Sequence, residues 1–171
     1  MLMRALTILL TNAAYLFVLS TFNSELAPSA YLVLPALFII PAALYLDFLP
    51  MLAVVGVSAF LCSSTTGVRA GLTAALWLSA AFAVHGMRFR FRSGDWFSIT
   101  ALVEITNIIL VFFYALLFPQ DVWGVFEYAS RVSADALLSA AVLLFAGKFC
   151  TVLPVSLANF CGIEMSIDGE D

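Results

Sequence analysis

Long apolar runs, separated by short polar connections, fill most of this 171-residue chain. Hydrophobic residues make up 64% of the sequence and charged residues 11%. A soluble domain is about 45–50% apolar and about 25% charged, so this chain has too little polar surface to enclose a core in water. The sequence therefore predicts an integral membrane protein.

The runs have the length of membrane-spanning helices. A helix needs about 20 residues to cross the ~30 Å hydrocarbon core of a bilayer, which leaves room for at most about six crossings. The runs also lack the alternation of apolar and polar residues that marks the strands of a membrane barrel. We expect an all-α fold, a polytopic transmembrane helical bundle that forms a single domain over 1–171. The predicted spans are about 5–22, 31–49, 51–66, 70–87, 97–118 and 134–153, with an acidic tail over 154–171.

Two of these runs have a second interpretation. The run 5–22 follows Arg4 and resembles a signal peptide, but it is long for a signal core and no small-residue cleavage site follows closely, which favours an uncleaved span. The run 51–61 is short enough to be re-entrant, although its extension to Thr66 favours a short crossing.

The connection 119–133 mixes aromatic and charged residues and is interpreted as an amphipathic segment on the membrane interface, with Ser133 and Asp135 starting the sixth helix.

The basic residues predict the orientation. With six crossings and a cytoplasmic N-terminus, the cytoplasmic side holds Arg4, Arg88, Arg90, Arg92 and Lys148. The outer side holds Arg69 and Arg131. This asymmetry is the one that membrane proteins show, and it places both termini in the cytoplasm. The cluster Arg88, Arg90 and Arg92 is then a cytoplasmic basic loop that anchors the protein at anionic lipid.

Four polar side chains in or beside the spans are candidates for a buried role: Glu104, Asn107, His85 and Asn12. A carboxylate inside a span must face the bundle, pair with a cation or be protonated. The structural interpretation is that Glu104 pairs with His85 or Arg88 and pins the fourth and fifth helices together. The functional one is a proton or substrate site, but a single carboxylate makes a poor relay. Asn12 is expected to form an interhelical hydrogen bond.

No catalytic motif is present. His85 is the only histidine, and the three cysteines lack the CxxC or His-paired spacing of a metal site. We therefore predict a protein without enzymatic activity, metal or cofactor, and nothing in the sequence indicates a nucleic-acid partner.

The central third of the chain has an order of features that is typical of one family of small membrane proteins. The shared order is a proline-bearing second span, a glycine-containing third span, and an Ala/Leu-rich fourth span that ends in basic residues. In this chain the order is represented by LPALFIIPAALYLDFLP (34–50), MLAVVGVSAFLCSSTTGVRAGLTAALWLSAAF (51–82) and HGMRFRFR (85–92). In this order the chain resembles the MreD family of rod-shape-determining proteins. Gly56 and Gly67 match the family's glycine positions, whereas Cys62 and Ser63 replace its usual acid at the end of the third span.

The resemblance implies a non-catalytic scaffold in the bacterial inner membrane. It would support cell shape and peptidoglycan elongation through contacts with an MreC-like scaffold and with cell-wall synthesis proteins. The alternative from another class is the substrate-binding membrane component of an energy-coupling-factor type vitamin transporter. A closed, enclosed cavity on the outer face would favour the substrate binder. A solid core with an exposed apolar groove between helices would favour the scaffold.

Overall fold

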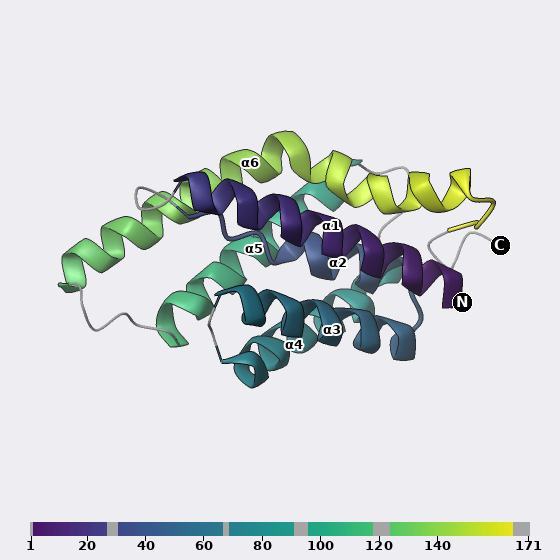
Figure 1. The fold of residues 1–171 in the computed structure, drawn as a ribbon, viewed down its shortest axis with the longest axis horizontal. Coiled ribbons are helices and arrows are strands. Elements are labelled where there is room, and N and C mark those ends of the chain that lie inside the picture. The colour runs from purple at the N-terminus through teal and green to yellow at the C-terminus, as the bar shows by residue number, and fades with distance from the viewer. Residues whose placement is uncertain (1, 27–30, 67–68, 91–95, 118–123, 166–171) are drawn as a thin grey trace.

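The computed structural model describes residues 2–26, 31–66, 69–90, 96–117 and 124–165, and these residues form a bundle of helices without strands (Figure 1). The elements are α1 (Leu2–Leu26), α2 (Ala36–Tyr45), α3 (Phe48–Thr66), α4 (Ala70–Met87), the 3-10 turn η1 (Arg88–Arg90), α5 (Trp96–Leu117) and α6 (Val125–Phe160).

Five of these helices, α1 and α3 to α6, are long and apolar enough to cross a membrane. The predicted fold class, an all-α transmembrane bundle, is therefore confirmed. The short third run is also long enough, because α3 begins at Phe48 and includes Pro50 in its first turn, where the missing N–H of proline costs no hydrogen bond.

The second predicted span is wrong in its extent. Instead of a helix over 31–49, the structure has the ten-residue α2 preceded by a non-helical segment, residues 31–35, which we call the strap. Pro35 explains the boundary, because proline disfavours the helical conformation in the residue before it and fits the start of a helix. Nine of the ten residues of α2 are buried, so α2 lies inside the bundle rather than facing lipid.

The sixth helix is longer than predicted. It begins at Val125, so the part of the expected interfacial segment from that residue onward is continuous with α6, and Ser133 and Asp135 lie inside the helix. Residues 119–123 of that segment are outside the described residues. Pro154 also lies inside α6, which ends at Phe160. Beyond that end, Gly162 has a φ of 74°, and the N–H groups of Gly162 and Ile163 donate to the carbonyls of Asn159 and Ala158 and close the last turn.

The two ends of the bundle differ in charge. α1 and α5 begin, and α4 and α6 end, at the end we call the basic end (Figure 1). Arg4, Arg88 and Arg90 lie there, with Lys148 in the half of α6 nearest to it. Arg69 and Arg131 belong to the opposite end, and Arg92 is outside the described residues. The grouping on which the predicted orientation depends is thus retained, while the orientation itself stays a prediction.

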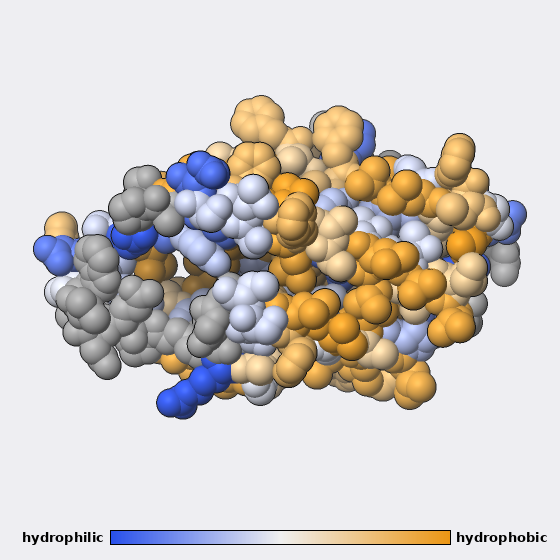
Figure 2. All heavy atoms as spheres, in the orientation of Figure 1, coloured by the Kyte–Doolittle hydropathy of each residue, from blue (hydrophilic) through white to orange (hydrophobic). Residues whose placement is uncertain are grey.

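The core surrounds α2. Phe38 of α2 stacks on Trp77 of α4, with ring centroids 5.4 Å apart and planes 13° from parallel, and both rings are buried. Large apolar side chains on the outside of α1, α5 and α6, such as Phe145, Phe112 and Phe17, are exposed. Figure 2 shows that hydrophobic residues cover most of the surface visible toward the basic end, as expected for a surface in contact with lipid.

Candidate functional site

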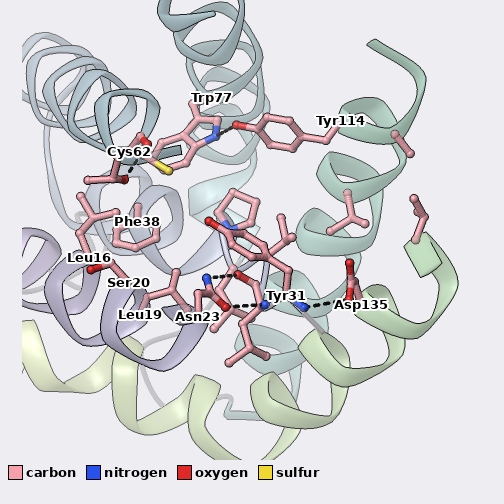
Figure 3. A pocket seen from close by; sticks show the side chains of 18 of the residues that line it. Leu16, Leu19, Ser20, Asn23, Tyr31, Phe38, Cys62, Trp77, Tyr114 and Asp135 are labelled. Atoms are coloured by element: carbon pink, nitrogen blue, oxygen red, sulfur yellow. Dashed lines mark hydrogen bonds between the residues drawn. The ribbon is translucent and has the colours of Figure 1, made fainter. Parts of the chain in front are cut away.

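The strap is held by side chains from the helices around it. Asn23 of α1 makes two hydrogen bonds to Leu32: its Nδ2 donates to the carbonyl at 3.1 Å, and its Oδ1 accepts from the backbone N–H at 2.7 Å. The backbone N–H of Tyr31 donates to Asp135 Oδ1 of α6 at 2.9 Å (Figure 3). The amide of Asn23 thus satisfies both backbone polar groups of Leu32, as pairing with a neighbouring β-strand would.

The next strap residue is satisfied from two further positions. The backbone N–H of Val33 donates to Ser139 Oγ of α6 at 3.0 Å, and its carbonyl accepts from Asn107 Nδ2 of α5 at 3.1 Å. Asn107 Oδ1 also accepts from the N–H of Ala36, the first residue of α2, at 3.5 Å. Irregular backbone at membrane depth is tolerated only where its polar groups find such partners. Asn107 therefore makes the break before α2 possible.

The other end of α2 is bound from α4 and η1. His85 Nδ1 lies 3.0 Å from the carbonyl of Ala43 and donates to it, since a carbonyl can only accept. Arg88 Nη1 donates to the carbonyl of Leu46 at 3.3 Å, and its guanidinium lies over the Phe89 ring. Carbonyls at a helix C-terminus lack intrahelical partners and carry partial negative charge, so a basic group there is stabilising.

Asn12 reaches α2 from a third direction. Its Nδ2 donates to the carbonyl of Phe38 at 3.1 Å and to Ser58 Oγ of α3 at 2.9 Å. Three of the four predicted buried polar residues, Asn12, His85 and Asn107, thus act on one element, the backbone of α2 and its strap.

A cavity of about 710 Å³ lies beneath the strap at the end of the bundle opposite the basic end. Figure 2 shows the surface hollowed in this part of the molecule and bordered by polar residues. Phe38 and Trp77 form part of its wall, and Trp77 Nε1 donates to the hydroxyl of Tyr114 at 2.7 Å (Figure 3). Arg131 and Asp135, one turn apart on α6, add charged groups to the lining. The size and the mixture of aromatic and polar groups suit a small-molecule site.

Many polar groups of this cavity are already engaged. Both ends of the Asn23 amide bind Leu32, Asp135 binds the strap, and the hydroxyl of Tyr128 donates to the carbonyl of Ala115 at 2.9 Å. The polar wall therefore serves the protein's own backbone first, which leaves fewer groups to recognise a ligand.

A second concave surface, the α4–α5 groove, lies on the side of the bundle. α4 packs chiefly on α3 and α2, and α5 packs chiefly on α6, so the two helices leave an apolar channel between them. Its lining consists mostly of small and aliphatic side chains: Ala80, Ala83, Val84, Met87, Ser98, Ala101, Leu102, Ile105, Thr106, Ile109 and Leu110. Both helices are membrane-spanning candidates, so the groove opens toward the bilayer rather than toward water.

Glu104 is placed differently from the other three polar residues. The expected contact of Glu104 with His85 or Arg88 is not formed among the described residues. Those two side chains bind the carbonyls of Ala43 and Leu46 instead. Glu104 Oε1 is enclosed and has no hydrogen-bond partner. The side chain is only partly buried, on the margin of the lipid-facing surface of α5.

Sequence reasoning missed Asn23 and Ser139, and it assigned Asp135 to a helix start. A signal for two of them exists in the sequence: Asp135 and Ser139 are four residues apart and so share one face of a helix. No feature of the local sequence announces that Asn23 would bind the strap. Among the described residues no group of three or more His, Cys, Asp or Glu side chains is arranged to hold a metal ion.

Comparison of the chain with protein families, with curated proteins and with solved structures found no match.

Proposed function

We propose that this protein is a non-catalytic membrane scaffold similar to MreD, which supports cell shape and peptidoglycan elongation in a bacterial inner membrane. It would do so by binding partner membrane proteins, an MreC-like scaffold and cell-wall synthesis proteins. The observation that carries this proposal is the α4–α5 groove, an apolar channel between two spans that the described part of the chain leaves open.

The chemistry of the groove fits a partner helix. Helices in a membrane gain little from the hydrophobic effect, so they associate where small residues let their backbones approach closely. Ala80 and Ala83 of α4 and Ala101 of α5 provide such a surface. The cavity is the weaker support for function, since its polar groups are largely committed to holding the strap.

The test is to fill the groove. Ala83 is exposed and lines the groove, so Ala83→Phe places a large side chain in the channel without disturbing the core. We expect this variant to lose co-purification with a co-expressed MreC-like partner. Ala75→Phe is the matched control, because Ala75 is exposed on the same helix and does not line the groove. Equal recovery of the partner with both variants would contradict the proposal.

A second candidate function is supported by the cavity. The substrate-binding component of an energy-coupling-factor type transporter needs a pocket at the outer end of its bundle, and a volume of about 710 Å³ lies within the range of small-molecule sites. In this function Phe38 and Trp77 would contact the apolar body of a vitamin, and Arg131 and Asp135 its polar groups.

This candidate is tested with riboflavin, thiamine and biotin, added separately to the protein in lipid nanodiscs. Saturable binding of one vitamin that is lost in Leu19→Trp, a substitution that fills the cavity, would support substrate binding. Leu144→Trp on the exposed side of α6 is the control. Absence of saturable binding for all three, or binding that Leu19→Trp leaves unchanged, would count against it.

A further inference from the structure

Glu104 lies within a membrane span, on the border of a surface that faces lipid. It is eight residues after the start of α5, which places it about 12 Å along the helix. Ile108, one turn later on the same face, is 54% exposed, and Phe97, two turns earlier, is 81% exposed. The partly exposed side chain of Glu104 therefore borders a surface on which a neighbouring helix in the membrane can pack.

No described residue donates a hydrogen bond to the enclosed oxygen of this carboxylate. Glu104 Oε1 is enclosed without a hydrogen-bond partner, and the two expected partners at the end of the fourth helix, His85 and Arg88, bind backbone carbonyls at the end of α2. A carboxylate that faces hydrocarbon without a partner is costly, and such residues are found where they meet an opposite charge or a polar pathway.

We propose that Glu104 is the docking point for a transmembrane helix of a partner protein that carries a lysine or arginine at the same depth. A cationic side chain in hydrocarbon has the same need for a counter-charge, so the pair stabilises both helices and fixes their register. Glu104 does not line the α4–α5 groove, so this surface is a second contact in addition to the groove. The proposal deepens the scaffold function by naming the chemistry of the partner, and it rests on that function.

The experiment uses designed single-span peptides as probes. The full-length protein is labelled with a donor fluorophore and placed in phosphatidylcholine vesicles with an acceptor-labelled Leu/Ala peptide. The peptide carries either one lysine at the depth of Glu104 or leucine at that position. We expect energy transfer to show about tenfold tighter association of the lysine peptide. The preference should be lost in Glu104→Leu and reduced in Glu104→Gln.

Glu25→Gln is the control, because Glu25 is exposed at the far end of α1 and should leave the preference unchanged. Glu104→Leu replaces a carboxylate with an apolar side chain on a lipid-facing border, so it is expected to fold. Equal affinity for the two peptides, or a lysine preference that survives in Glu104→Leu, would overturn the proposal. The Ala83→Phe variant tests the groove separately from Glu104. A negative result for the groove would therefore leave the lysine preference of Glu104 unchanged, and the failure of one proposal can be distinguished from the failure of the other.

Discussion

Asn107 shows how one side chain can decide the course of the backbone. Its amide donates to the carbonyl of Val33 and accepts from the N–H of Ala36, so it binds the strap and the first residue of α2. At membrane depth there is no water to form hydrogen bonds with these two backbone groups, so without the asparagine each would lack a hydrogen-bond partner. The side chain therefore stabilises the break between strap and helix.

Replacing Asn107 should destabilise the fold more than replacing an asparagine on the surface. Asn107→Leu keeps the volume but leaves the carbonyl of Val33 without a partner, which is expected to lower the free energy of unfolding by about 1–3 kcal/mol. Unfolding in detergent micelles measures the change. Asn159→Leu is the control, because Asn159 is exposed near the end of α6. Equal effects of the two substitutions would show that the amide does not hold the strap.

The hydrogen bond between Asn12 and Ser58 should contribute to stability. Asn12 donates to Ser58 and to α2 at once, so the two side chains should be energetically coupled. In a double-mutant cycle with Asn12→Ala and Ser58→Ala, we expect a coupling energy of about 0.5–1.5 kcal/mol. Free-energy changes that simply add would mean that the hydrogen bond contributes nothing to stability.

At the residue scale the sequence identified polar side chains but not what they bind. Asn12, His85 and Asn107 could be selected because polar groups inside apolar runs need partners. Their common target could not be found, since it depends on which helices become neighbours in three dimensions. The partners expected for Glu104, His85 and Arg88 at the adjacent end of the fourth helix, bind the end of α2 instead.

At the scale of elements, α2 is the helix whose form the sequence concealed. Its run has the length and apolarity of a complete span, and only Pro35 indicates where the helix must begin. By contrast, the fourth span is predicted as 70–87 and is found as Ala70–Met87. In an uninterrupted apolar run within a membrane, only a helix satisfies all the backbone hydrogen bonds within the segment. Local pattern determines the long spans, while remote side chains determine the short helix.

The buried position of α2 predicts a large effect of truncation there. Phe38→Ala removes a ring that is 1% exposed and stacks on Trp77, so it should cost about 3–5 kcal/mol of unfolding free energy. Phe112→Ala makes the same change on the exposed face of α5, where lipid or detergent replaces the lost contacts. Thermal unfolding of both variants in micelles compares them. A similar loss at the two positions would contradict the placement of α2 inside the bundle.

For the whole molecule, the charge asymmetry between the two ends predicts the orientation in the membrane. Ser24 and Ser130 are exposed at the end opposite the basic end, and Cys161 is exposed near the end of α6. In intact cells a membrane-impermeant maleimide should label Ser24→Cys and Ser130→Cys, each introduced singly with Cys161, Cys62 and Cys150 replaced, and Cys161 is tested with Cys62 and Cys150 replaced. The native Cys161 should react only after the membrane is permeabilised. The reverse labelling pattern would show that the basic end faces outward.

For the molecule as a whole, we propose a scaffold whose α4–α5 groove receives a partner helix. The most direct measurement is cell shape after depletion of the protein, followed by expression of Ala83→Phe or Ala75→Phe from a second copy. The account predicts that depleted rod-shaped cells become round, that Ala75→Phe restores the rods, and that Ala83→Phe accumulates in the membrane at the same level without restoring them. Cells that keep their shape on depletion, or equal rescue by the two variants, would contradict it.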